Sequence, residues 1–308
     1  MAIKSLSRYK KNNIFNGDFL KVFEDMSSHC FVPEFIAVLA GIKPVFRTYA
    51  IHVDRYPIFQ KICKKYSIFV EFSDFRISSN DWISIVKKSQ FVFAYFSKYK
   101  KLAKEAKDVE YNIFVKNEKS YKTLLRFSQL MGYPKCCFDF FLSGWKKIIS
   151  DKTSCVRPDQ FEYISHQNTK EVFSFYLNNL IKGNNYYLIS HLPHSYNCKP
   201  SIEYAKKVLT AIKKVNPEIA EKITTILKYP VMKFLNRGQY LRFIKGKVKN
   251  DNEIVYEVSE GDDKLNKKFI KGNKILAERT KIKIFKNKKL VDVYNKKNKL
   301  DGVIFDFK

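Results

Sequence analysis

Two short segments that carry cysteine and histidine beside proline constrain this chain most. The first, residues 132–137, reads Gly-Tyr-Pro-Lys-Cys-Cys, and the second, residues 191–200, reads His-Leu-Pro-His-Ser-Tyr-Asn-Cys-Lys-Pro. Each lies at the predicted start of a helix, with Pro134 or Pro200 in the first helical turn, where proline is favoured. If the two segments form one site, the fold must join parts of the chain more than 50 residues apart.

The residue types in these segments are those of a soft-metal site. Cys136 and Cys137 fall in the first turn of a predicted helix, where unpaired N–H groups and the helix dipole favour a thiolate. The second segment offers two imidazoles and a thiol in a loop ahead of a helix, an arrangement common in metal sites. Two histidines with two thiolates suit zinc, and three thiolates with one histidine suit zinc or an iron–sulfur cluster. We therefore predict zinc or an iron–sulfur cluster as the cofactor, with the ligands Cys136, Cys137, His191, His194 and Cys198.

Other interpretations of the same residues stay open. The spacing contains neither the C-x-x-C nor the H-x(3–5)-H pattern of a standard zinc finger. Cys137 or Cys198 can act as a nucleophile with a histidine as base. A disulfide between the segments, or burial without chemistry, is a further alternative. Glu110, Asp139 and Glu203 are carboxylates that can orient a ligand or serve as a general base. We take Cys137 and Asp139 as the candidate catalytic residues.

The charge of the chain bears on its partners. The sequence has 58 Lys and Arg against 30 Asp and Glu, a net charge of +28. Such a positive charge is typical of proteins that bind RNA or another polyanion. Nearly all the basic residues are lysines, however, as expected of an AT-rich genome, and arginine, the better bidentate phosphate partner, is not enriched. Binding of RNA or another polyanion is thus one expectation, and a merely solvated surface is the other.

Several classes of protein are not indicated by this sequence. It has no glycine-rich phosphate loop, so ATP and NAD are not implied. It has no run of about 18 apolar residues, so we predict no membrane span. The polar, basic first residues lack the apolar core of a secretory signal, and we expect a cytoplasmic protein whose cysteines are thiols or ligands. The remaining cysteines are expected to be structural: Cys30 (after His29), Cys63 and Cys155.

Periodicity divides the chain into three predicted parts within an α+β or α/β fold. Strands that alternate with helices predict an N-terminal α/β layer over residues 1–116, whose last strand is Tyr111–Val115. A helical centre, residues 117–229, includes a predicted helix at Thr169–Ile181, whereas residues 150–168 look irregular. Short strands between polar turns, the first of them at Val231–Phe234, predict a small β-rich module over residues 230–308, where 21 basic residues stand against 10 acidic ones.

The two cysteine segments also carry a family resemblance. Leu130–Phe141 (LMGYPKCCFDFF) and His191–Ser201 (HLPHSYNCKPS) resemble the mainly archaeal family of domain of unknown function 483, whose pattern is GYPxCC followed by HxPCSxxC. The likeness covers about residues 91–228. The chain departs from the pattern at His194, where the family has cysteine, which puts a purely thiolate site in doubt. The resemblance implies that both segments form one thiol-centred site in an archaeal-type cytoplasmic protein, and it supplies no reaction.

Three hypotheses of function follow. The first is a zinc- or iron–sulfur-dependent enzyme acting on RNA or a small metabolite. The second is a non-catalytic protein associated with nucleic acid, in which the cysteines stabilise the fold and the β-rich module binds. The third is a thiol oxidoreductase without metal.

Overall fold

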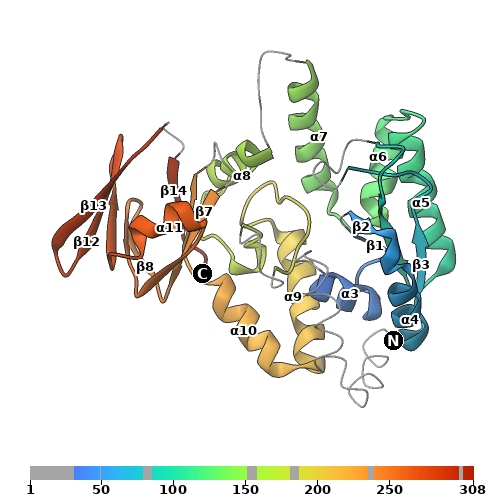
Figure 1. Ribbon diagram of the computed structural model, residues 1–308, viewed down its shortest axis with the longest axis horizontal. Coiled ribbons are helices and arrows are strands. Elements are labelled where there is room, and N and C mark those ends of the chain that lie inside the picture. Colours follow the sequence, from blue (N-terminus) through green and yellow to red (C-terminus); the bar gives the residue numbers. More distant parts are fainter. Residues whose placement is uncertain are drawn as a thin grey trace. The chain divides into compact units, whose positions relative to one another are not determined.

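The fold combines helices with antiparallel sheets, as the α+β prediction states (Figure 1). The computed structural model describes residues 31–48, 50–78, 85–150, 158–180, 187–234, 239–297 and 301–308. These residues form two compact units, each made of separate parts of the chain. The first unit comprises residues up to 139 together with 183–191 and 203–221, and the second comprises 140–182, 192–202 and 222–308. The three-part division of the sequence stays a prediction.

The first unit is built from short strands and the helices that cover them. A three-stranded sheet has the order β1-β5-β3, and a separate pair joins β2 to β4, all antiparallel. The core packs Val45, Phe93 and Tyr95 against Ala106 and Leu130. The strands are β1 (Phe46–Arg47), β2 (Ile51–His52), β3 (Phe69–Phe72), β4 (Phe91–Val92) and β5 (Ala94–Ser97), and the helices include α3 (Phe31–Leu39), η2 (Val53–Arg55), α4 (Tyr56–Tyr66), α5 (Lys100–Phe114) and α6 (Tyr121–Leu130).

Three further helices are α7 (Lys135–Ser150), α9 (Lys199–Val215) and α10 (Pro217–Leu227). Their ends lie within one or two residues of the ranges that the sequence pattern predicts, which are Pro134–Ile149, Pro200–Lys214 and Pro217–Leu227. The prediction was accurate here because proline lies at or next to the first turn of each helix, where its missing N–H costs no hydrogen bond. The start of α9 also has a firm backbone cap, since the Cys198 carbonyl accepts a hydrogen bond from the Ile202 N–H at 3.0 Å.

The second unit contains the predicted β-rich region. One sheet has the order β10-β7-β6-β14 and the other the order β13-β12-β11-β9-β8, with every pairing antiparallel. Their apolar faces share one core that includes Phe234, Phe243, Ile275 and Ile284. The strands are β6 (Val231–Phe234), β7 (Gln239–Ile244), β8 (Lys247–Asn250), β9 (Glu253–Val255), β10 (Val258–Gly261), β11 (Lys274–Ala277), β12 (Lys281–Lys286), β13 (Lys289–Asn295) and β14 (Asp301–Phe305), and the helices include α8 (Pro158–Gln167), η3 (Phe175–Leu177) and α11 (Asp263–Phe269).

Three local predictions were wrong. The segment Tyr111–Val115 is no strand: its first four residues end α5, where Ile113 is buried on the helix face and overrides a strand-like composition. Residues 169–180 form no long helix, because their N–H groups bond elsewhere: Ser174 N–H donates to the Tyr196 carbonyl at 2.8 Å. Part of the stretch expected to be irregular is the helix α8. Among the helices of the described residues, none combines the length and the apolar character needed to cross a membrane.

Candidate metal centre

A turn at Gly132 connects α6 to the first cysteine segment, which starts α7. Gly132 adopts a left-handed φ of 71° and ends α6, while the Tyr133 N–H donates to the Ser128 carbonyl at 3.0 Å. The Pro134 carbonyl then accepts hydrogen bonds from the N–H groups of Cys137 and Phe138, both at 3.0 Å, which opens α7. In this motif Gly132 therefore ends α6, Tyr133 links the two helices, and Pro134 starts α7.

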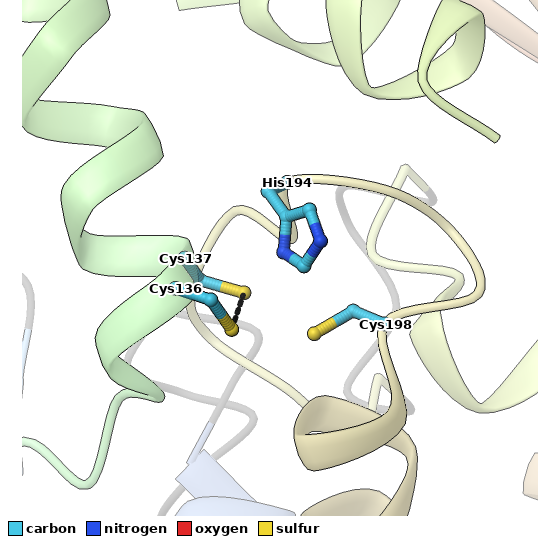
Figure 2. Close-up of side chains that lie close together, drawn as sticks. All are labelled: Cys136, Cys137, His194 and Cys198. Atoms are coloured by element: carbon cyan, nitrogen blue, oxygen red, sulfur yellow. Dashed lines mark hydrogen bonds between the residues drawn. The ribbon is translucent and has the colours of Figure 1, made fainter.

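The two cysteines in this first turn differ in their surroundings. Cys136 is exposed, whereas Cys137 is buried with 2% of its surface accessible. Their sulfur atoms are 4.0 Å apart, so no disulfide joins them. Neighbouring positions on a helix normally diverge by about 100°, yet the two sulfurs here lie on the same side of the first turn (Figure 2).

The second segment is held in place by hydrogen bonds from the end of α8. The Ser165 hydroxyl donates to the Pro193 carbonyl at 2.6 Å, and the Asn168 side chain donates to the His194 carbonyl at 3.0 Å. The Thr169 hydroxyl accepts from the Tyr196 N–H at 2.8 Å. These anchors fix the backbone on both sides of the His194 side chain. Sequence reasoning missed them, because residues up to 168 looked irregular and nothing marked a serine or asparagine there as a support.

The two segments bring four potential metal ligands together. The thiols of Cys136, Cys137 and Cys198 and one imidazole nitrogen of His194 all lie within 4.8 Å of one another. Figure 2 shows the three sulfurs and the imidazole pointing toward one another, the cysteines of α7 on one side and Cys198, just ahead of α9, on the other. Cys198 is buried and His194 is half-buried. The group can hold a metal ion, as the sequence predicts.

His191, the fifth predicted ligand, is not a member of this group. It is buried, and its ring centroid lies 5.4 Å from that of Tyr133 and 6.4 Å from that of Tyr204. Burial, and then the charge of Lys43, lower the pKa of this histidine to about 3. The imidazole is therefore neutral at pH 7 and lies among aromatic rings and a buried cation.

Lys43 belongs to a buried polar cluster around His191. Its ammonium group forms an ion pair with Glu34, and both residues are 3% exposed. The same ammonium donates to the Ser190 hydroxyl at 3.2 Å and lies 5.1 Å from the centroid of the Tyr133 ring. Neither Glu34 nor Lys43 stood out in the sequence, because a Glu-Lys pair nine residues apart carries no periodic signal of contact.

Asp139, the second candidate catalytic residue, is hydrogen-bonded at the surface of α7. Its carboxylate accepts from Lys135 at 2.5 Å and from the Tyr121 hydroxyl at 2.9 Å. The hydrogen bond from Lys135 contributes most to lowering the pKa of Asp139. Lys135 and Asp139 therefore form an i,i+4 ion pair on an exposed helix face. A catalytic role for Asp139 or Cys137 stays a prediction.

The remaining candidates are Cys63, two carboxylates and three residues that the structure does not describe. Cys63 is buried in α4, and burial raises the pKa of its thiol to about 12, as suits a structural residue. Glu110 is buried against Tyr95 and Arg47, and Glu203 is exposed on α9. His29, Cys30 and Cys155 lie outside the described residues.

Comparison with known proteins adds no relative: no family model, no curated protein and no solved structure matches this chain. The resemblance to the family of domain of unknown function 483 therefore stays a prediction. The geometry of the four-residue group is the ground for a functional proposal.

Proposed function

We propose that this chain is a zinc-binding protein whose single ion is held by Cys136, Cys137, His194 and Cys198. The observation that carries the proposal is the mutual distance of the four donor atoms, all within 4.8 Å. A tetrahedral zinc ion with Zn–S bonds of about 2.3 Å holds its ligands roughly 3.8 Å apart. The Cys136 and Cys137 sulfurs, at 4.0 Å, are already near that spacing. The four ligands of an iron–sulfur cluster are divided among two or four iron atoms, and ligands of different iron atoms lie further apart, so we favour zinc over the cluster.

The number of ligands favours a structural role for the ion. Structural zinc sites use four protein ligands, whereas catalytic sites use three and leave one position for water or substrate. Three thiols and one imidazole fill a tetrahedron. Bound zinc would supply folding free energy by joining the start of α7 to the segment ahead of α9. An enzyme that uses this centre must first release one ligand, so the metal-dependent enzyme on RNA or a small metabolite stays a prediction.

Metal analysis of the full chain tests the proposal. We expect a colourless protein with one zinc per chain after oxygen-free purification, measured by elemental analysis and visible absorption. Cys198→Ser should lose the zinc, whereas His191→Gln, a matched change outside the group, should keep it. A brown protein that contains iron would support the cluster instead. A wild-type protein that takes up no zinc from a buffered zinc solution would contradict the proposal.

The second candidate function, binding of RNA or another polyanion, is favoured by one face of the five-stranded sheet. Alternate residues of β8, β9, β11, β12 and β13 face away from the core, because Ile254, Ile275 and Ile282 on the other face are fully buried. The outward residues alternate charged with apolar side chains along the paired rows, and three of the four charged residues are lysines. The rows are Lys247, Val255, Lys274 and Phe285, and then Glu253, Leu276, Lys283 and Val293. Lysines beside apolar side chains suit single-stranded nucleic acid, which presents phosphates and base faces together.

Binding to a labelled oligouridine tests this second candidate. We expect an affinity that falls steeply as salt rises, because counterions are released from the phosphates. Lys247→Glu with Lys283→Glu should weaken binding and flatten the salt dependence. Lys207→Glu with Lys214→Glu, the same charge change on the exposed side of α9, is the control for net charge. Equal losses in both variants would show that the sheet face has no special part.

A thiol oxidoreductase without metal is the third prediction. It requires a redox-dependent change in the number of thiols in protein that has never bound metal.

A further inference from the structure

We propose that the four-residue group is a peroxide-sensitive metal site, in which oxidation joins Cys136 to Cys198 by a disulfide and releases the ion. The release of zinc rests on the proposed function, whereas the disulfide does not. Three thiols within 4.8 Å of one another, of which Cys136 is the most accessible to solvent, carry the inference. Redox-sensing cysteines have this arrangement: an accessible thiolate beside a second cysteine that resolves its oxidised form.

The difference in exposure assigns the first step to Cys136. It is exposed in the first turn of α7, whereas Cys137 and Cys198 are 2% and 3% exposed. A peroxide arriving from solvent therefore meets the Cys136 sulfur first. The thiolate attacks one peroxide oxygen, the O–O bond breaks, and the leaving hydroxide takes up a proton to become water. The product is the sulfenic acid of Cys136.

Backbone geometry assigns the second step to Cys198 rather than Cys137. Adjacent residues have Cα atoms about 3.8 Å apart, which is below the range of about 4.4–6.8 Å usual for disulfides. Cys198 lies in non-helical backbone, one residue before α9 begins at Lys199. It is not the neighbour of Cys136 in the sequence, so the short Cα separation that opposes a link to Cys137 does not apply to it.

The chemistry balances without a further reactant. The Cys198 thiolate attacks the Cys136 sulfur, the S–S bond forms, the S–O bond breaks, and the leaving hydroxide takes up a second proton. The two sulfurs together lose two electrons, and one peroxide becomes two molecules of water. Only Cys137 and His194 then remain as donors. Two of four ligands do not retain a structural zinc ion, so oxidation empties the site.

The test uses the full chain loaded with zinc and treated with hydrogen peroxide. We expect one zinc released, detected with a chromogenic chelator, for each disulfide formed, and peptide mass spectrometry should find Cys136 linked to Cys198. A thiol reductant should restore zinc binding. Cys63, with its buried thiol, is the internal control and should stay unmodified. Zinc that stays bound while thiols are oxidised, or a disulfide at another pair, would overturn the inference.

Metal-free protein separates this inference from the proposed function. In Cys137→Ser, peroxide should still link Cys136 to Cys198. In Cys198→Ser, oxidation should stop at the Cys136 sulfenic acid, which a dione reagent traps as an adduct. If the purified protein never binds zinc but forms this disulfide, the zinc proposal fails and the redox inference holds. If zinc binds and peroxide forms no Cys136–Cys198 link, the redox inference fails and the zinc proposal holds.

Discussion

His191 and His194 lie three residues apart on one segment and have opposite surroundings. His194 is half-buried beside three thiols, and its own carbonyl is held by Asn168. His191 is buried near two tyrosine rings, with a pKa of about 3. Both histidines lie shortly before the helix start at Pro200, so the sequence pattern alone predicts both equally well as metal ligands. The comparison teaches that neighbouring elements, and not ligand type or spacing, decide which imidazole faces the sulfurs.

The largest effect that this comparison predicts is on metal affinity. Cys198→Ser removes one of four donors and should weaken zinc binding more than about 100-fold, since losing a residue that merely supports a ligand costs 10–100-fold. His191→Gln should change the affinity by less than about 10-fold. Competition with a chromogenic chelator measures both constants. If His191→Gln loses as much affinity as Cys198→Ser, the distinction between the two histidines is wrong.

The next largest effect concerns the buried ion pair beside His191. Glu34→Gln leaves the Lys43 ammonium buried without a counter-charge and should lower the free energy of unfolding by about 3–5 kcal/mol. Glu253→Gln, which breaks the partly exposed pair with Lys274, should cost less than about 1 kcal/mol. Urea unfolding of both variants gives the comparison. Equal stabilities would mean that the pair around His191 does not behave as a buried one.

A smaller effect is expected from pH. The folded pKa of His191, about 3, is below the ordinary value near 6.5, so unfolded chains bind more protons between these values. The stability that this group contributes is complete above pH 6.5 and is lost as the pH falls toward 3. Between pH 6.5 and 5 the loss should be about 2 kcal/mol. Unfolding of metal-free wild type and His191→Gln at these two pH values measures the effect: the free energy of unfolding of the wild type should fall by about 2 kcal/mol more than that of the variant.

The smallest effect is expected at Asp139. Asp139→Asn removes an exposed i,i+4 pair with Lys135 and should change stability by less than about 1 kcal/mol. Zinc affinity should not change, because the carboxylate is not in the ligand group. Thermal unfolding and the chelator assay check both statements. A large loss of zinc in this variant would give Asp139 a part in the centre that its present contacts do not explain.

The sequence was sufficient where local chemistry determines the structure. The helix Pro217–Leu227 and the strand Val231–Phe234 have the predicted bounds, since proline marks the helix start and the apolar run marks the strand. It failed at Tyr111–Val115 and at residues 169–180, where tertiary packing or hydrogen bonds outweigh local preference. For the site, it identified both segments and the four residues that the structure brings together, but it also included His191, which is not in the group. It could not identify Lys43, Glu34 or Ser165, because their contacts exist only once the chain is folded.

The order of synthesis follows from the distance between the two segments along the chain. About 60 residues separate Cys137 from Cys198, and a ribosome adds roughly 5–20 residues each second. The first two thiols therefore leave the ribosome several seconds before the other two donors are made. During that interval a metal ion finds only two ligands on the nascent chain and binds weakly. Capture of the ion is thus a late event, and it reports that the polypeptide has been made at least as far as Cys198.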